Sequence, residues 1–130
     1  CGAFRQHIEA SQWIYRWIEW GNGLRVRWLG SAYGDQGIFV RRTVYEEIGG
    51  FPQVPLMEDV SLVRKLRRRH KVALLPGPIH VDARRWKTYG PIRQTLRNWC
   101  LITAFRCGVS TKRLARFYRR HERLRDPTER

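Results

Sequence analysis

Two acidic residues, Glu58 and Asp59, stand side by side in the stretch GGFPQVPLMEDVSLVRKLRRRH, which spans residues 49–70. They follow a proline-rich loop and precede a strongly basic segment that we expect to be helical. One acid at a helix N-terminus is stabilised by the helix dipole by roughly 0.3–1 kcal/mol, so the second acid calls for another explanation. Two neighbouring carboxylates can divide the work of a site, one holding a hydroxyl substrate and the other removing its proton. The residues alone leave both interpretations open, a helix start or a working pair.

Two further stretches place polar residues at the ends of apolar elements. Asp35 and Gln36 stand between two glycines in GDQGIF. Glycine lets the backbone approach a ligand closely, although the stretch taken alone is more typical of an ordinary turn. Arg84 and Arg85 precede Trp86 in DARRWKTYG, where they offer planar bidentate donors for phosphate beside a stacking face. The alternative for this stretch is a solvated loop with the tryptophan packed on the core.

The segments RKLRRRH and KRLARFYRRHERLR are strongly basic and carry apolar residues at helical spacing. Such segments are typical of amphipathic helices whose charged face is solvated, and contact with anionic lipid headgroups is the second interpretation. We expect the last helix to bind anionic vesicles, less tightly as salt rises. The apolar stripe of this helix consists of Leu114, Phe117, Tyr118 and Leu124. Its arginines are Arg113, Arg116, Arg119, Arg120 and Arg123.

The composition excludes several classes of protein. The chain has 130 residues, enough for one domain, and 42% hydrophobic residues exclude a disordered chain. No apolar run approaches the roughly 20 residues of a membrane-spanning helix. Lys and Arg number 26 against 11 acids, so a formal charge of +15 favours nucleic acid, anionic lipid or phosphorylated substrates as partners. Three cysteines without a metal or CxxC spacing indicate reduced core thiols in a cytosolic protein.

The periodicity predicts an α/β fold in a single domain, with an α/β part up to about residue 90 and helices over residues 91–125. The strands are too few for a complete doubly wound sheet. The chain starts with Cys1 and shows no signal peptide, and its only methionine is Met57, which indicates a fragment or a processed product. In the first half we expect a helix over 11–20 capped by Ser11 and ended by GNG, a buried strand over 37–42, and a short helix opened by Thr43 and Glu46. A helix over 59–69, a strand over 71–75 broken by PGP, and an extended segment over 79–83 follow. The last two expected elements are helices from 91 to about 107 and from Ser110 onward.

These stretches, in this order, resemble the family 2 inverting glycosyltransferases, and most of all a bacterial subgroup of small soluble members. The matching motifs are GAFR at residues 2–5, YGDQGIFVRR at 33–42, IGGFP at 48–52, LMEDVSLVRKLRR at 56–68, ARRW at 83–86, YG at 89–90 and TLRNW at 95–99. The resemblance extends from Gly2 to about Tyr118. It matches only the C-terminal half of the family's catalytic domain.

The resemblance implies the C-terminal half of a GT-A fold, the fold of nucleotide-diphosphosugar transferases. That half has a short mixed sheet, flanking helices and a C-terminal helical pair. In the family, the N-terminal half binds the nucleotide, and its Asp-x-Asp motif holds a divalent metal, Mg or Mn, on the diphosphate. This sequence has no Asp-x-Asp, since its aspartates are at 35, 59, 82 and 126. The metal is therefore expected only in the complete enzyme.

The resemblance also assigns roles to the residues singled out above. Asp59 matches the catalytic base, and Glu58 would orient the acceptor or the sugar. Asp35 and Gln36 match positions that line the sugar pocket. His80 could approach a metal, as a C-terminal histidine does in some GT-A enzymes, although a lone histidine is more often structural. The arginine-tryptophan element near the diphosphate corresponds to Arg84, Arg85 and Trp86.

The expected function is sugar transfer from a nucleotide-diphosphosugar to an acceptor hydroxyl, in the cytoplasm, with a peripheral position at the inner face of the membrane as the second expectation for its location. The expected partners are the donor, the acceptor, and either the missing N-terminal half or a second copy of the chain. The alternative is a small basic module that binds anionic membrane or nucleic acid without catalysis. No helix-turn-helix, RRM or zinc pattern supports nucleic acid.

Overall fold

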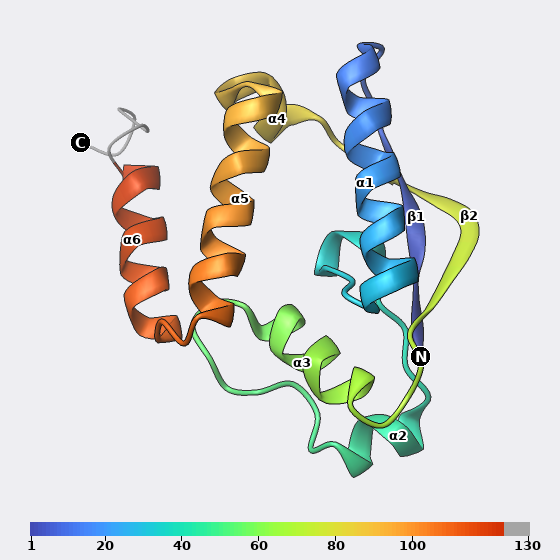
Figure 1. Ribbon diagram of the computed structural model, residues 1–130. Coiled ribbons are helices and arrows are strands. Elements are labelled where there is room, and N and C mark those ends of the chain that lie inside the picture. Colours follow the sequence, from blue (N-terminus) through green and yellow to red (C-terminus); the bar gives the residue numbers. More distant parts are fainter. Residues whose placement is uncertain (124–130) are drawn as a thin grey trace.

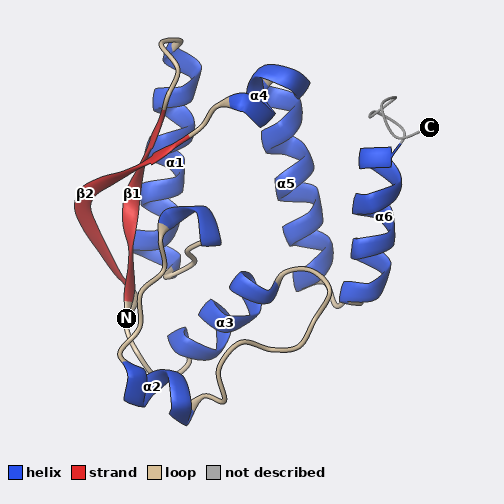
Figure 2. Ribbon diagram, turned by 180° about the vertical axis from the view of Figure 1, so that it is seen from behind, coloured by secondary structure: helices blue, strands red, loops and turns tan. Residues whose placement is uncertain are grey.

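The computed structural model describes the backbone of residues 1–123 and the side chains of residues 1–119. The predicted α/β class is confirmed. One parallel pair of strands lies against α1, while α5 and α6 stand on the opposite side and α3 connects the two sides (Figures 1 and 2). The elements are β1 (Gly2–Ile8), α1 (Trp13–Leu29), the 3-10 turn η1 (Gly34–Gln36), α2 (Arg42–Glu47), α3 (Glu58–Arg67), β2 (Ala73–Val81), α4 (Arg84–Tyr89), α5 (Pro91–Arg106) and α6 (Thr111–Arg123).

The sheet pairs β1 with β2, and the register shifts by two residues along the way. Phe4 lies opposite Leu75, whereas Arg5 lies opposite Pro78. The two skipped residues belong to the PGP stretch, which was expected to end a strand. That prediction was wrong, because an irregularity in the ladder absorbs the prolines, which cannot donate a backbone hydrogen bond. The predicted strand over 71–75 and the extended segment over 79–83 are parts of one longer strand.

The predicted buried strand over residues 37–42 is also absent from the described structure. Phe39 forms a single antiparallel bridge with Gly2, and α2 begins at Arg42. Gly37 has φ of +60°, so the chain turns directly before the apolar run. Ile38 still packs into the core, which explains why the run is apolar although it forms a loop.

The first helix runs through the GNG stretch that was expected to end it. It ends at Gly30, whose φ of +57° gives a left-handed C-cap. Asn22 holds the middle of the helix in place, since its side-chain amide donates to Gln6 Oε1 at 2.6 Å and accepts from Arg25 Nη1 at 2.8 Å. The N-cap is Gln12 rather than Ser11. Tertiary contacts therefore outweigh the poor helix propensity of glycine.

The remaining helices lie close to the predicted segments. Val60, Val63 and Leu66 of α3 are buried, as expected. Ser110 Oγ accepts from the backbone of Arg113 at 3.4 Å, at the start of α6. Thr43 was predicted as the N-cap of α2, and this prediction is wrong, because the N-cap residue is Arg41. The short helix α4 was not among the predicted elements.

Three apolar clusters make up the core. One joins the sheet to α1 and α3, the second joins α1 to α4 around Tyr15 and Trp86, and the third joins α3, α5 and α6 around Phe105 and Leu114. The three cysteines are free thiols, as expected, but Cys100 and Cys107 are exposed rather than in the core. No helix in the described part of the chain has the length and the apolar composition needed to cross a bilayer.

Two glycine substitutions test this architecture. Gly21→Ala should raise the free energy of unfolding by about 0.5–1 kcal/mol, because the position lies inside a helix and nothing stands within 4 Å of the added Cβ. Gly2→Ala should lower it by about 1–3 kcal/mol, because its Cβ would lie 2.6 Å from the carbonyl oxygen of Ala73 and 2.7 Å from Phe39 Cζ. Urea unfolding monitored by circular dichroism measures both. A loss of stability in Gly21→Ala would contradict a helix that continues through GNG.

Candidate active site

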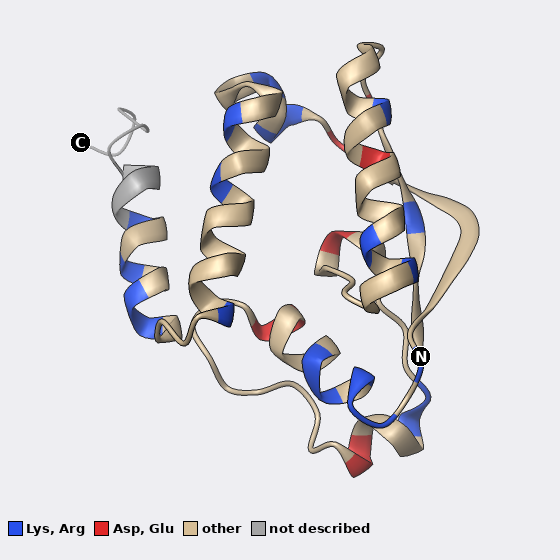
Figure 3. Cartoon of the chain, in the orientation of Figure 1, with Lys and Arg blue, Asp and Glu red and all other residues tan. Residues whose placement is uncertain are grey.

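Two neighbouring clefts share three residues, Asp35, Arg85 and Asn98. The first, which we call the acidic cleft, has a volume of about 240 Å³ and lies where η1, the start of α3, α4, α5 and α6 meet. The second cleft, of about 270 Å³, extends from there over the end of β2 and α4. The acidic segments of η1 and of the start of α3 both lie on the inner side of the arc of helices (Figure 3). The two clefts together form the candidate site.

Asp59 lines the acidic cleft from the first turn of α3. Its Oδ2 accepts a hydrogen bond from the backbone N–H of Gly34 at 2.6 Å, and its Oδ1 accepts from the backbone N–H of Val60 at 2.7 Å. A Cβ at Gly34 would lie 3.2 Å from Oδ2, so the absence of a side chain there allows the close approach. Asp59 therefore fastens α3 to η1, and its carboxylate has a set orientation.

The residue before the acidic pair has an unusual backbone conformation. Met57 is the only non-glycine residue with positive φ in the described chain, at +64°. Such a conformation costs of order 1–3 kcal/mol and is held only by surrounding structure. Met57 lines the acidic cleft and packs against the cluster that includes Val60. The strained turn presents the α3 N-terminus, with Asp59 on it, to the cleft.

Asp35 lines both clefts, and the residue as a whole is exposed. Protein atoms around its carboxyl group partly desolvate it, and this desolvation raises the pKa of Asp35 above its ordinary value. The nearby charge of Asp59 acts in the same direction, whereas Gln6 and the positive charge of Arg25 act against it. A carboxyl group with a raised pKa beside a second carboxylate is typical of sites that transfer protons.

Arg25 holds the loop that carries Asp35. Its guanidinium donates to Ser31 O, Asn22 Oδ1 and Gln36 Oε1, each at 2.8 Å, and lies 3.5 Å from the ring centroid of Tyr33. Burial lowers the pKa of Arg25, and burial raises the pKa of Tyr33. Because all these partners lie between residues 22 and 36, one side chain orders the whole connection from α1 to η1.

Gln36 and Glu58 lie outside both clefts. Gln36 is fully buried, and its Oε1 accepts from Arg25 and from the backbone N–H of Tyr33 at 3.1 Å. It supports the loop beneath the site. Glu58 is exposed at the start of α3. Of the two adjacent acids, only Asp59 faces the cleft.

Arg84 and Arg85 are exposed on α4 and both line the second cleft. Arg84 Nε lies 3.7 Å from Asp82 Oδ2, and Arg85 Nη1 donates to Tyr118 Oη at 3.3 Å. Trp86 is 8% exposed and packs edge-on against Tyr15, so it offers no open stacking face. Its buried indole N–H has no hydrogen-bond partner among the described residues.

Three polar residues of the clefts were not predicted from the sequence as site residues. Asn98 lines both, Gln94 lines the second cleft and Tyr118 lines the acidic cleft. Gln94 is 4% exposed and donates to Asn98 Oδ1 at 3.2 Å. The available signal was their spacing, because two amides four residues apart lie on the same face of α5 as the apolar residues of the core. A polar pair on a buried helix face often marks a site.

His80 lies apart from both clefts. Its ring packs against that of His7 at 5.1 Å, and its Nδ1 lies 3.5 Å from Glu9 Oε1. Within the described residues, no three His, Cys, Asp or Glu side chains gather closely enough to hold a metal ion. The metal expected of a complete enzyme therefore does not fit a donor set on these residues, and we assign no step to it.

The raised pKa of Asp35 predicts a pH dependence of stability. The folded protein favours the neutral carboxyl, so it binds more protons than the unfolded chain between the two pKa values, and stability falls as pH rises through that interval. Asp35→Asn mimics the neutral form. Its free energy of unfolding relative to the native chain should therefore increase from about pH 3 to about pH 7. Urea unfolding across this range measures the difference.

Glu58→Gln is the charge-matched control, because it removes a negative charge from an exposed residue outside both clefts. Subtracting its profile corrects for the general effect of net charge on unfolding. A difference between Asp35→Asn and the native chain that stays constant with pH would contradict the desolvation of Asp35.

Comparison with known proteins identifies no relative. No family model, no curated protein and no solved structure matches this chain.

Proposed function

We propose that this chain is the acceptor-binding, C-terminal half of an inverting glycosyltransferase of the GT-A type. One observation carries the proposal. Asp35, Asp59 and Arg85 come from three separate motifs of the resemblance, and all three line one cleft. Motifs that were matched only by their order along the chain thus meet in space, as the parts of one site must.

The proposed reaction is a single displacement. The oxygen of an acceptor hydroxyl attacks the anomeric carbon, the bond from that carbon to the nucleotide diphosphate breaks, and the hydroxyl proton passes to a carboxylate. Asp59 is the proposed base. The backbone N–H of Gly34 fixes one of its oxygens, and a carboxylate oxygen has a second lone pair free to accept the proton. Positioning of this kind keeps the base within reach of the hydroxyl.

Asp35 and the amide of Asn98 are proposed to bind hydroxyl groups of the sugar, because both line the two clefts where these join. Arg84 and Arg85 supply positive charge to the second cleft, where they would offset the charge that develops on the departing diphosphate. The unpaired indole N–H of Trp86 is a further donor beside this cleft. Glu58 and Gln36 are proposed to act on the fold of the site rather than on the substrate.

The nucleotide-binding half is proposed to add its strands along β1. The sheet of the described residues has two strands, so each strand has an outer edge. The prolines of β2 cannot donate to a further strand, which makes β2 a natural end of a sheet. Beyond its bridge to Phe39, β1 carries no such block. That other half would hold the divalent metal and the nucleotide, and the arginines of the second cleft would contact only the diphosphate.

Substitution of Asp59 tests the base in a complete enzyme that joins this chain to a nucleotide-binding half. Asp59→Asn keeps the acceptor of one hydrogen bond and removes the proton acceptor, so transfer should slow by a factor of about 10²–10⁴. Donor affinity should change little, because the base contacts the acceptor. Sugar transfer and donor binding are measured side by side, and Glu58→Gln is the matched control, with a transfer rate close to that of the unmodified enzyme.

Arg85→Ala should give a different pattern, with weaker donor binding as well as slower turnover. If Arg85 contacts the phosphates only as the bond breaks, the loss will fall on turnover alone. Unfolding curves of each variant separate loss of function from loss of structure, since Asp59 also fastens α3 to η1. An Asp59→Asn enzyme that stays folded and keeps nearly full transfer would remove Asp59 as the base.

A further inference from the structure

Four of the six tryptophans lie on α1, and all four are exposed. Successive tryptophans are separated by four, three and eight residues, so they follow one side of the helix. The half-buried Leu24 lies between the third and the fourth. We call this row the tryptophan ridge; it consists of Trp13, Trp17, Trp20 and Trp28, with exposures of 70%, 62%, 60% and 76%. The residues that α1 buries, Tyr15 and Val26, lie on the opposite side.

The apolar residues at the start of α1 differ in exposure. Trp13, Ile14, Trp17 and Ile18 recur at spacings that place them on one apolar face of the helix. The two isoleucines are half-buried, whereas the two tryptophans point outward. A row of exposed indoles of this length is far more apolar surface than a helix needs for folding, and such patches mark interaction sites.

The apolar surface continues onto α5. Trp13 and Ile92 line a common hollow of about 450 Å³ between the two helices. Ile92, Leu96 and Trp99 follow one another at helical spacing, and each is more than half exposed. The surface thus includes aliphatic as well as aromatic side chains.

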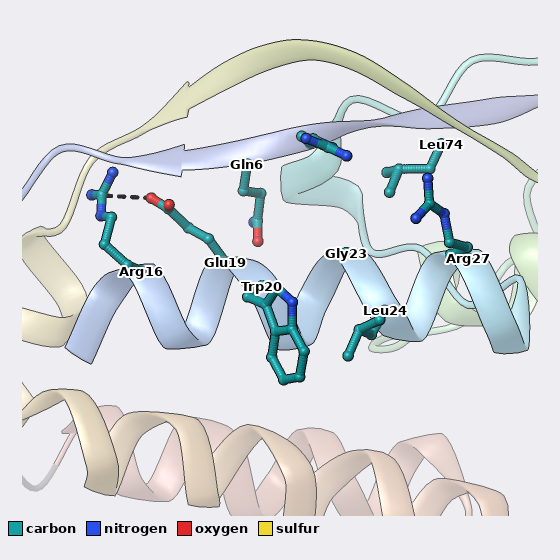
Figure 4. Close-up of a pocket in the computed structure, with 9 residues that line it drawn as sticks. Gln6, Arg16, Glu19, Trp20, Gly23, Leu24, Arg27 and Leu74 are labelled. Carbon is teal, nitrogen blue, oxygen red and sulfur yellow. Dashed lines mark ion pairs between the residues drawn. The ribbon is translucent and has the colours of Figure 1, made fainter. Parts of the chain in front are cut away.

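A pocket of about 310 Å³ opens beside the ridge, between α1 and the sheet (Figure 4). Its wall contains Arg5, Arg16 and Arg27, with Glu19 as its one acidic residue and Trp20 at its edge. Arg16 is held by Glu19 at 3.1 Å and by the carbonyl oxygen of Ile8 at 2.6 Å. Arg5 and Arg27 have neither a hydrogen bond nor an ion pair within the described residues. The pocket therefore has an excess of positive charge with two uncommitted guanidinium groups.

We propose that α1 docks this protein on an anionic phospholipid membrane. The tryptophan ridge enters the boundary between headgroups and acyl chains, where indole rings prefer to lie. Arg5 and Arg27 bind lipid phosphates in the pocket beside it, because guanidinium groups pair with phosphate in a bidentate manner. This inference uses none of the residues of the candidate active site and does not depend on the proposed sugar transfer.

The charge and the chemistry of this surface favour a membrane over other partners. A second copy would bring two chains of charge +15 together, which opposes association through this face. Single-stranded nucleic acid stacks its bases on aromatic rings in a basic groove. Here Trp17 and Trp20 instead pack edge to face against each other, with ring centroids 5.7 Å apart. The neighbouring exposed residues of α5 include the aliphatic Ile92 and Leu96. Both features favour contact with acyl chains over stacking with bases.

The last helix is less suited to this role than its sequence suggested. Leu114 and Ala115 of α6 are buried, and Leu114 packs with Leu101 and Phe105. Of the stripe that was expected to contact lipid, Leu114 is therefore part of the core and Tyr118 packs partly buried against it, whereas Phe117 is 55% exposed. Leu124 lies outside the described residues, as do the side chains of Arg120 and Arg123. The helix that presents an apolar ridge to solvent is α1.

Vesicle sedimentation tests the proposal with the 130-residue chain. Vesicles of phosphatidylcholine containing about 30% phosphatidylglycerol should bind the chain at least about tenfold more tightly than pure phosphatidylcholine, and salt should weaken the binding. Tryptophan emission should shift to the blue and be quenched by brominated acyl chains. Trp17→Gln with Trp20→Gln should lower the affinity by about tenfold or more, and Arg5→Gln with Arg27→Gln should do so for the anionic vesicles only.

Arg116→Gln with Arg119→Gln is the charge-matched control on α6, and it should change the affinity less than about twofold. All substituted residues are exposed, and thermal unfolding by circular dichroism shows whether each variant keeps its fold. Equal affinity for neutral and anionic vesicles would overturn the proposal. A loss of binding in the α6 variant but not in the α1 variants would overturn it too. Tighter binding of single-stranded RNA, or a dimer that the Trp17→Gln and Trp20→Gln pair dissolves, would assign the ridge to another partner.

Discussion

The guanidinium of Arg25 is the contact on which the candidate site depends. It ties the middle of α1 to Ser31 and Gln36 and stacks on Tyr33, so the loop that carries Asp35 has a defined shape. A buried guanidinium is stable only when its donors are satisfied and negative charge lies nearby. Asp35 and Asp59 supply that charge. The two carboxylates that line the acidic cleft thus both lie within the electrostatic reach of the guanidinium that orders the loop.

The second constraint is the contact between Asp59 and Gly34. It joins two segments that lie far apart in the sequence, and it requires a backbone N–H without a side chain beside it. A structural role and a catalytic role for Asp59 are therefore compatible rather than exclusive. The hydrogen bonds that fasten α3 also orient the carboxylate in the cleft. The strained backbone at Met57 belongs to the same arrangement, since it sets the direction in which α3 begins.

The two proposals use different kinds of surface. The candidate active site is a pair of clefts formed where η1 and the start of α3 meet α4, α5 and α6, and its acids and arginines lie among apolar side chains. The proposed membrane face is a ridge of exposed indoles on the side of α1 that faces away from the sheet, with a basic pocket beside it. An enzyme that contains both could act on an acceptor that is itself bound to the membrane. The positive charge of the chain would serve both surfaces, by attracting phosphate groups in each.

Local patterns in the sequence determined the class of fold, the positions of α3, α5 and α6, and the residues Asp35, Asp59, Arg84 and Arg85 as candidates. Those signals are short-range, since helix periodicity, caps and adjacent functional groups can be read within one stretch. The tertiary structure decided that GNG lies inside a helix, that PGP lies inside a strand, and that residues 37–42 form a loop. It also decided that Asp59 rather than Glu58 faces the cleft, and that the tryptophans of α1 face outward. For GNG, PGP and Asp59 the deciding interaction was a contact between residues distant in the sequence: Asn22 with Gln6, the pairing of β1 with β2, and Asp59 with Gly34. No local pattern contains such contacts.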